Sequence, residues 1–382
     1  MVVKSFIDVH PRVGIIGSGS CIPPLRLTNK DLERMINTSD EWILSHVGIK
    51  ERSIAPEHYN IYTMGAASAL EAIEDAHLQV KDIDAIIVGH NYTDEFTVPS
   101  AACIIQHLIG TTNIKAEDIS AGCSGGIYAL DRAIDLMHTA YLSNKSKLNV
   151  LVGAVDKLSN VVDWKDRNTC ILLSDSASFQ VLNFFNDGGF LSSYTGADGS
   201  IGNTISYRSG YNSQLVNQNP IEFSNEQTTK RHYFKMDGRA VYKFAVRKMP
   251  EAMRKSWEAA RFKQEDMNKL MKRLISHQAN LYIIDSSGKR LGIDPEKIYT
   301  KGVKFLGNSS AASAGIGLDD EYKSNSLNEG DLVGLVVFGA GATWGSEVIE
   351  WNKRNGQAYK QEKQESLVDN LYKKYKIWSK DI

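Results

Sequence analysis

The chain has 382 residues, of which 42% are hydrophobic and 23% are charged, and its formal net charge at pH 7 is −1. This composition is typical of a globular protein and excludes a disordered or fibrous chain. A net charge near zero provides no overall attraction to nucleic acid or to an anionic membrane. No apolar run reaches the ~18 residues of a membrane span, and residues 1–12 lack the apolar core of a signal peptide. We therefore expect a cytoplasmic protein.

The cysteines favour a reducing environment without a structural metal. The chain has four of them, and no two are spaced as a CxxC pair. This spacing argues against a disulfide framework and against a zinc site. We expect free thiols, of which at most one needs to be reactive, and no bound metal.

Apolar strands and helical repeats alternate along the first half of the chain. This alternation predicts an α/β fold with mostly parallel sheet. The expected strands lie at 13–17, 85–89, 113–120, 148–153 and 170–182. Two short helices are expected to begin near residues 28 and 39, and three longer ones to cover 62–77, 100–109 and 124–141.

The second half repeats this plan after a polar, poorly patterned stretch. It predicts helices over 238–261, 279–291 and 309–318, the first interrupted at Met249-Pro250, and strands over 272–276 and 332–338. Two halves of similar content suggest an internal duplication. We divide the chain into an N-terminal half (1–185), an insertion or linker (186–235), a C-terminal half (236–351) and an extension (352–382).

The extension is expected to be a helix that packs back on the body. Its apolar residues recur at helical spacing, which is typical of an amphipathic helix with one buried face. They are Val368, Leu371, Tyr372, Tyr375 and Trp378.

Cys123 is the candidate nucleophile. It lies in the sequence AGCSGG, where the expected strand 113–120 ends and the expected helix 124–141 begins. The free N–H groups and the positive dipole end of a helix N-terminus favour a thiolate over a thiol. Glycines beside the cysteine allow backbone and substrate to approach the sulfur. Taken alone, the motif also fits a buried structural cysteine.

Two polar motifs in the second half stand at similar junctions. They are SHQAN, with His277, and GNSSAAS, with Asn308. If the halves pack about a pseudo-dyad, both side chains converge on Cys123. The cysteine can then attack a thioester carbonyl, while neutral His277 and the Asn308 amide donate hydrogen bonds to an oxygen that gains negative charge. A satisfied core histidine and a helix cap are the alternatives.

These motifs, together with TSDEWI (38–43), GIKER (48–52) and GAGATWGS (339–346), resemble the β-ketoacyl-acyl-carrier-protein synthase III branch of the thiolase superfamily. The resemblance covers about residues 11–351. It implies thiolase-like duplicated layers in the order α-β-α-β-α about a pseudo-dyad, and a homodimer. It also implies that the enzyme holds no cofactor and that its substrates are phosphopantetheine thioesters of coenzyme A or of an acyl carrier protein.

The resemblance implies roles for the central residues. Cys123 would be the acylated nucleophile, and His277 and Asn308 would stabilise the enolate of the extender. The main-chain N–H groups of Cys123 and Ala340 would form an oxyanion hole. Alanine stands at 340 where the family usually has glycine, and a main-chain donor tolerates this unless φ is positive.

The resemblance also implies a substrate tunnel. Trp42 and Arg167 would grip the nucleotide of coenzyme A, Tyr242 would line the pantetheine tunnel, and Val98 would enter the acyl pocket of the partner subunit. Two arginines usual in the family are replaced, by His46 and Tyr282. These replacements weaken the case for coenzyme A as the acyl donor.

Arg239, Lys243 and Arg247 stand at i, i+4 and i+8 of one expected helix. In the family this helix meets the acidic acyl carrier protein, so we expect a docking surface here. A solvated basic face is the alternative.

The function implied is that of a ketosynthase. It would load an acyl group onto Cys123 and condense it, in a Claisen reaction, with a malonyl- or β-ketoacyl-carrier-protein extender. LSDSAS (173–178) departs from the glycine-rich run of housekeeping members, which suggests a natural-product member of the dialkylresorcinol or stilbene type that also closes a ring. The alternatives are an acyltransferase of the same fold that makes an ester or amide and a papain-like protease, although Cys123 lacks a CGSCW-type context.

Overall fold

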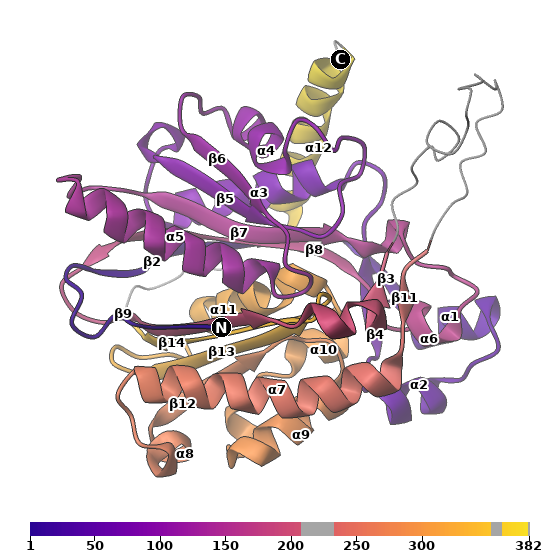
Figure 1. The fold of residues 1–382 in the computed structure, drawn as a ribbon. Coiled ribbons are helices and arrows are strands. Elements are labelled where there is room, and N and C mark those ends of the chain that lie inside the picture. Colours follow the sequence, from indigo (N-terminus) through magenta and orange to yellow (C-terminus); the bar gives the residue numbers. More distant parts are fainter. Residues whose placement is uncertain (208–232, 353–360, 381–382) are drawn as a thin grey trace, which may run out of the picture.

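The computed structural model describes residues 1–207, 233–352 and 361–380. The chain forms two sheets with helices between them and on both outer faces, in the order α-β-α-β-α (Figure 1). This arrangement confirms the predicted fold class. Residues 208–232 of the expected linker, and 353–360 and 381–382 of the expected extension, lie outside the described residues.

The first sheet contains, in spatial order, β2 (Arg12–Cys21), β8 (Asp175–Phe185), β7 (Val150–Lys157), β5 (Ala85–Gly89) and β6 (Lys115–Ile119). The second contains β1 (Val2–Ser5), β9 (Gly189–Ala197), β14 (Thr343–Glu350), β13 (Leu332–Gly339) and β12 (Met271–Ser276). Two short hairpins pair β3 (Leu25–Thr28) with β4 (Glu51–Ile54) and β10 (Ile205–Ser206) with β11 (Lys235–Met236).

Helices α5 (Gly125–Leu142) and α11 (Ser313–Lys323) form the middle layer and contact both sheets. The outer face of the first sheet carries α3 (Ile61–Asp75), α4 (Ala101–Ile109) and α12 (Gln361–Ser379), and that of the second carries α7 (Gly238–Ala259) and α9 (Leu281–Leu291) (Figure 1). The shorter helices are α1 (Asn29–Met35), α2 (Asp40–Val47), α6 (Arg167–Cys170), α8 (Met267–Leu270) and α10 (Lys301–Phe305). None of the described helices combines the length and apolarity needed to cross a bilayer.

The sheets are mixed, whereas the sequence predicted mostly parallel strands. β5 is parallel to β6 and β7, and β12 is parallel to β13, but the other pairs of the two sheets are antiparallel. The expectation was wrong for two reasons: β9 and β14 were overlooked, and the predicted strand β8 runs antiparallel to both of its neighbours, β2 and β7. The strand expected at 170–182 begins only at Asp175, because residues 167–170 form α6.

β9 lies inside the segment 186–235 that the sequence analysis assigned to a linker. It pairs with both β1 and β14, so residues 189–197 belong to the second sheet. Its serines are buried and satisfied: Ser192 donates to the carbonyl of Ser256, and Ser193 donates to Asp131. Buried serines interrupt the buried apolar residues Phe190, Leu191 and Tyr194, so the strand shows neither an alternating nor a continuous apolar pattern, and for this reason it was missed.

α7 continues without a break through Pro250, where the sequence predicted an interruption. Proline removes one backbone donor and usually kinks a helix. Here Met249, Met253 and Trp257 are fully buried on the face that packs against the second sheet. Tertiary packing therefore outweighs the local preference.

The C-terminal extension forms α12, as predicted, and packs on α3 and α4 (Figure 1). Val368, Leu371 and Tyr375 are buried, and Tyr372 and Trp378 are partly buried in the same cluster. Gln364 at its start donates to the carbonyl of Ser20 (2.6 Å).

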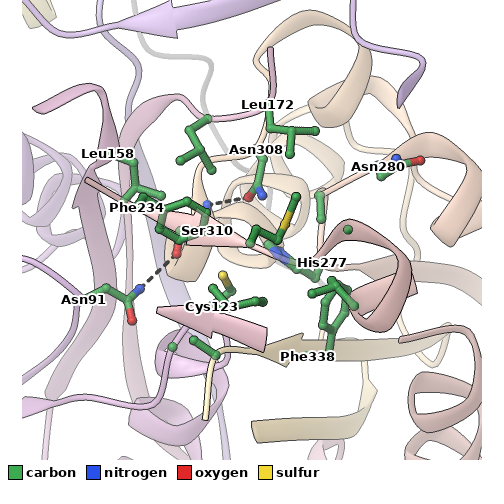
Figure 2. Close-up of a pocket in the computed structure, with 18 of the residues that line it drawn as sticks. Asn91, Cys123, Leu158, Leu172, Phe234, His277, Asn280, Asn308, Ser310 and Phe338 are labelled. Carbon is green, nitrogen blue, oxygen red and sulfur yellow. Dashed lines mark hydrogen bonds between the residues drawn. The ribbon is translucent and has the colours of Figure 1, made fainter. Parts of the chain in front are cut away.

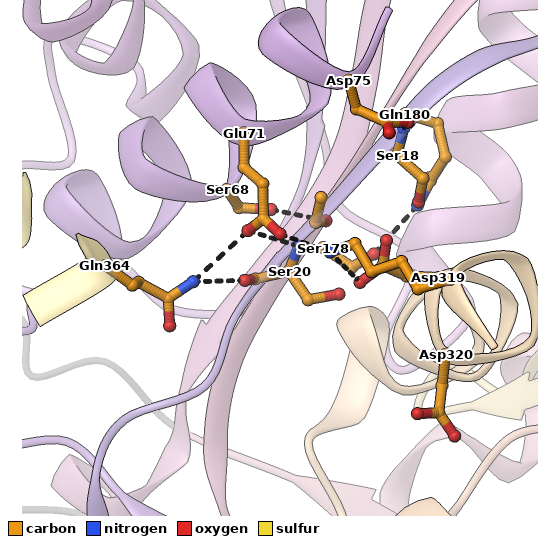
Figure 3. Close-up of polar contacts among 12 residues, drawn as sticks. Ser18, Ser20, Ser68, Glu71, Asp75, Ser178, Gln180, Asp319, Asp320 and Gln364 are labelled. Carbon is orange, nitrogen blue, oxygen red and sulfur yellow. Dashed lines mark hydrogen bonds and ion pairs between the residues drawn. The ribbon is translucent and has the colours of Figure 1, made fainter. Parts of the chain in front are cut away.

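A buried ion cluster joins the first sheet's outer helix α3 to the middle helix α11 (Figure 3). Lys323 pairs with Glu71 and with Asp319, and all three side chains are largely buried. Burial raises the pKa of Glu71 to about 7, although the charge of Lys323 opposes this rise. Lys323 is the counter-charge of both acids, so removal of the lysine leaves both of them unpaired.

We expect Lys323→Met to lower the free energy of unfolding by roughly 3–5 kcal/mol, since it leaves buried carboxylates without a counter-charge. The loss should shrink below about pH 6, where Glu71 takes up a proton. Urea unfolding of wild type and variant, carried out at neutral pH and below about pH 6, measures the loss at each pH. The matched control is Lys301→Met, which removes the exposed pair with Asp320 and should cost at most about 1 kcal/mol. Equal losses in the two variants would show that the buried cluster contributes no more to the free energy of unfolding than an exposed ion pair does.

Candidate active site

A cavity of about 1130 Å³ brings together Cys123, His277 and Asn308, the three residues predicted to carry the chemistry. Figure 2 shows their side chains around one space, with Cys123 from the first half and the other two from the second. The remaining wall is largely apolar and includes Leu158, Val161, Ile171, Leu172, Phe234, Ile283 and Phe338. The arrangement suits an apolar ligand whose reactive end lies at the sulfur.

Cys123 sits in a tight turn between β6 and α5. Gly122 has a φ of 59°, and Ser124 is the N-cap residue of α5. A Cβ on Gly122 would lie 2.5 Å from the backbone N of Ala340, and a Cβ on Gly339 would lie 2.4 Å from the backbone N of Cys123. Both positions therefore require glycine, because the turn and the end of β13 touch backbone to backbone.

Burial of the Cys123 sulfur works against the thiolate that the sequence predicted. Burial raises the pKa of Cys123 to about 11, although hydrogen bonds from Ser310 and from the N–H of Ala340 oppose this rise. The nearby carboxyl group of Asp156 raises it further. Desolvation of the thiolate thus opposes the effect of the favourable helix terminus.

His277 follows β12 and is neutral. Burial lowers the pKa of His277 to about 3. Its Nδ1 lies 2.7 Å from the hydroxyl of Ser313, and that hydroxyl accepts the N–H of Gln278 (3.3 Å). The described residues offer the Ser313 proton no other acceptor, so we assign it to Nδ1. The imidazole proton is then on Nε2, and His277 is a hydrogen-bond donor on that side.

Asn308 is fixed at the start of the GNSSAAS turn. Its backbone bonds to Leu172 and Ser174 on both sides, and its Oδ1 accepts the N–H of Ser310 (2.9 Å; Figure 2). The side chain therefore has its Nδ2 left to donate. His277 and Asn308 thus present neutral donors, as the proposed enolate chemistry requires.

The N–H groups predicted to form an oxyanion hole both lie at the sulfur. The backbone N–H groups of Cys123 and of Ala340 each interact with the Cys123 side chain. Ala340 has no positive φ, whereas Gly341 beside it has a φ of 135°. This explains why alanine is tolerated at position 340.

Trp42 lines the cavity, and Arg167 lies over its ring, with 4.2 Å between the guanidinium carbon and the ring centroid. The ring of His46 also stacks on Trp42, at 4.0 Å. The two predicted nucleotide-binding side chains are thus adjacent. A base can insert between Trp42 and Arg167 only after Arg167 moves, because a sandwiched ring needs about twice the present separation.

The remaining predicted residues divide into two groups. Tyr242 and Arg239 line the cavity, and the hydroxyl of Tyr242 contacts that of Ser286 at 2.9 Å. Lys243 and Arg247 are exposed on α7 outside the cavity. Val98 is 83% exposed and does not line the cavity of its own chain.

The sequence analysis missed the residues behind the sulfur. Asn91, just after β5, donates to Ser310 (2.9 Å) and to Asp156 (2.8 Å). Ser310 belongs to the GNSSAAS motif, so its neighbourhood was flagged, but its hydroxyl was given no role. An acid at the end of the buried strand β7 was the available signal for Asp156. Within the described residues, no group of His, Cys, Asp or Glu side chains is arranged to hold a metal ion.

We predict that His277 stays neutral, with its proton on Nε2, from about pH 5 to pH 9, because burial disfavours the imidazolium. NMR of 15N-histidine protein reads the tautomer directly, and the His277→Gln spectrum assigns the signal. In Ser313→Ala the Nδ1-bound form should appear. An imidazolium signal at pH 6 would contradict the assignment.

Comparison with known proteins identifies the family of the chain. The family model described as 3-oxoacyl-[acyl-carrier-protein (ACP)] synthase III matches residues 117–199, and that for its C-terminal part matches residues 258–351. The first range holds Cys123, and the second holds His277 and Asn308. α12 lies beyond the matched ranges.

Complete relatives are similar along almost their whole length. The β-ketoacyl-[acyl-carrier-protein] synthase III of Caldanaerobacter subterraneus subsp. tengcongensis is 40% identical over 341 residues, which are 89% of this chain and 98% of the relative. The synthase III structure from Aquifex aeolicus VF5 has a TM-score of 0.77 at 36% identity and covers 89% of this chain and 100% of its own. The priming β-ketosynthase of the R1128 polyketide pathway gives a TM-score of 0.78 at 27% identity, over 91% of this chain and 97% of its own. The chain belongs to the β-ketoacyl-acyl-carrier-protein synthase III family.

Proposed function

We propose that this enzyme loads an acyl group from a thioester onto Cys123 and condenses it with an extender carried by acyl carrier protein. The observation that carries the proposal is the meeting of one thiol, two neutral donors and two backbone N–H groups in an apolar cavity. As a member of its family, the enzyme is an acyltransferase that forms carbon–carbon bonds. The thiolase fold and the family rule out the papain-like alternative.

Loading is a thioester exchange. The Cys123 sulfur attacks the acyl carbonyl, and the N–H groups of Cys123 and Ala340 donate to the oxygen as it gains negative charge. The pantetheine thiol leaves, and the acyl group remains on Cys123. The apolar wall of the cavity then surrounds the acyl chain.

Condensation uses the two donors of the second half. Nε2 of His277 and Nδ2 of Asn308 donate to the thioester oxygen of the extender as it becomes an enolate. The enolate carbon attacks the acyl carbonyl, and the bond from that carbonyl to Cys123 breaks. The β-ketoacyl product leaves on its carrier.

A malonyl extender fits the site better than one that must lose a proton. Loss of carbon dioxide yields the enolate without a base. Three titratable groups of the usual acid–base types line the described part of the cavity. Asp237 caps the start of α7, His46 stacks on Trp42, and His277 holds a proton on Nε2. None of the three is placed as a base beside the Cys123 sulfur. Ring closure on a β-ketoacyl extender has no comparable support.

We propose acyl carrier protein as the partner, docking on Arg239, Lys243 and Arg247. None of these three forms an ion pair within the described part of the chain, and Arg239 also lines the cavity. The enzyme would act as a cytoplasmic homodimer that holds no cofactor. The exposed Val98 and the edge strand β6 support a subunit contact on that side, and the adjacent Trp42 and Arg167 support coenzyme A as a donor.

His277→Ala should reduce condensation by roughly 100-fold or more, because one donor to the enolate is lost, while Cys123 acylation changes by less than about tenfold. Intact-protein mass after exposure to acetyl-coenzyme A reports acylation. Mass analysis of the product formed with malonyl-carrier protein reports the new carbon–carbon bond. Cys123→Ala, the control, should do neither. Equal loss of both steps in His277→Ala would contradict the role of His277 as a donor to the enolate. An ester or amide product would instead favour an acyltransferase of the same fold that forms no carbon–carbon bond.

The double variant Lys243→Glu/Arg247→Glu should lower kcat/KM for malonyl-carrier protein by roughly tenfold or more at low salt, because like charges then face the acidic carrier. The defect should diminish as salt screens the surface. Acylation by acetyl-coenzyme A should not change. Lys269→Glu, an exposed lysine on α8, is the charge-matched control. A double variant that behaves as this control would place the docking surface elsewhere.

A further inference from the structure

The segment GIKER (48–52) ends in an arginine that is fully buried. Arg52 lies on β4, outside the lining of the active-site cavity. The hydrogen bonds that it donates within the described chain go to two neutral oxygens, the main-chain carbonyl of Ile171 and the side-chain Oδ1 of Asn29. An apolar side chain of similar size often fills a buried space at a lower cost than a charge does. The arginine therefore indicates a specific use of its donors.

Arg52 anchors the start of the segment 171–174. This segment joins α6 to β8 and has no regular structure. Nε of Arg52 donates to the carbonyl of Ile171 at 2.8 Å, and Nη2 donates to the same oxygen. A guanidinium is planar and holds its donors in a rigid fork, so two of its N–H groups on one oxygen fix where that carbonyl lies.

The same segment holds the backbone of Asn308. The carbonyl of Leu172 accepts the N–H of Asn308 (2.9 Å), and the N–H of Ser174 donates to the carbonyl of Asn308 (2.9 Å). Leu173, between them, forms a parallel bridge with Asn308. Figure 2 shows Leu172 and Asn308 together at the cavity. The position of Asn308 thus depends on the segment that Arg52 anchors.

Arg52 also contacts the turn before Asn308. Gly307 has a φ of 78°, and a Cβ on it would lie 3.1 Å from Cγ of Arg52 and 3.2 Å from the carbonyl oxygen of Leu172. The stem of the arginine therefore packs against this turn. The turn lies between β4 and the segment 171–174, and Arg52 joins the two.

Asn29 holds the guanidinium in this orientation. Its Oδ1 accepts from Nη1 of Arg52, while its Nδ2 donates to Asp40 (2.7 Å) and to the carbonyl of Ile49 (2.9 Å). Asn29 is itself buried, so both ends of its amide are fixed by the protein. The guanidinium cannot turn away from Ile171 without breaking its bond to Asn29.

We propose that Arg52 is a positioning residue for Asn308. It fixes the segment 171–174 and the turn at Gly307, and together these aim Nδ2 of Asn308 at the enolate oxygen of the extender. The inference rests on the proposed function, in which Asn308 serves condensation and not loading. A misplacement of about 1 Å in a reacting site can cost roughly 100-fold in rate. Arg52 touches no reacting atom and acts through Asn308.

The first test compares the two steps in single variants. Arg52→Met keeps an apolar stem and removes the donors. It should slow condensation of acetylated enzyme with malonyl-carrier protein by roughly tenfold or more, while acylation of Cys123 by acetyl-coenzyme A changes by less than about threefold. Arg52→Lys keeps the charge and one donating group, so its condensation rate should lie between those of Arg52→Met and wild type. Intact-protein mass reports acylation, and product mass in a single turnover reports condensation.

Ser53→Ala is the matched control. Ser53 is buried beside Arg52 on β4, and its hydroxyl donates to the carbonyl of Pro23, away from the segment 171–174. Its loss should leave both steps within about twofold of wild type. Thermal unfolding shows which variants are folded, and Arg52→Lys carries the test if Arg52→Met does not fold.

The second test repeats the Arg52 substitution in an Asn308→Ala background. Asn308→Ala alone should slow condensation by roughly 100-fold, because one donor to the enolate is lost. If Arg52 acts through Asn308, its substitution should then cost less than about twofold more, since the donor that it positions is already absent. A general structural defect would instead slow condensation by the same factor in both backgrounds.

Additive losses in the double variant would overturn the positioning role, and so would equal losses of acylation and condensation in Arg52→Met. Asn308→Ala distinguishes these results from failure of the proposed function. If Asn308→Ala loses condensation while both Arg52 variants keep it, the positioning role is wrong and the synthase mechanism stands. If Asn308→Ala condenses as wild type does, the role proposed for Asn308 is wrong, and the positioning role is rejected with it.

Discussion

The close contact between the turn at Cys123 and the end of β13 determines the geometry of the whole site. The backbone atoms of 122–123 meet those of 339–340 so tightly that neither Gly122 nor Gly339 has room for a Cβ. This contact joins the two halves at the nucleophile and brings the Ala340 N–H to the sulfur. Because β13 also pairs with β12, which leads to His277, one backbone contact fixes the oxyanion donor and orients the second half of the site.

The motifs at strand-to-helix junctions could be predicted from the sequence because their chemistry depends on local features. A glycine-flanked cysteine, a histidine after a strand and an asparagine before a helix each carried a signal, and the structure brings Cys123, His277 and Asn308 to one cavity. β9 could not be predicted, since its buried serines find partners on α7 and α5 that only the tertiary structure supplies. The burial that raises the pKa of Cys123 could not be predicted either, because the degree of burial at a junction is not a local property.

The C-terminal extension packs against a loop that also reaches the active site. α12 lies beyond the ranges that match the family, and its Tyr375 donates to Glu95 while Trp378 packs edge-on against Phe96. Glu95 and Phe96 belong to the irregular loop after β5, and Asn91 starts that loop. The helix therefore supports the far side of a segment whose near side holds Ser310. This connection could not be read from a helical stripe alone, which identifies a buried face but not its partner.

Two kinds of polar group meet at the Cys123 sulfur, and their separation follows from burial. On one side His277 and Asn308 are neutral donors, each oriented by a neighbour that occupies its other polar atom. On the other side Asn91 and the N–H of Ala311 donate to the buried carboxyl group of Asp156, and these hydrogen bonds oppose the rise in its pKa that burial causes. A buried neutral imidazole carries no charge to attract a counter-ion, so its Nε2 proton is left for the substrate. The cavity can therefore stabilise an anion on the substrate side through neutral donors alone.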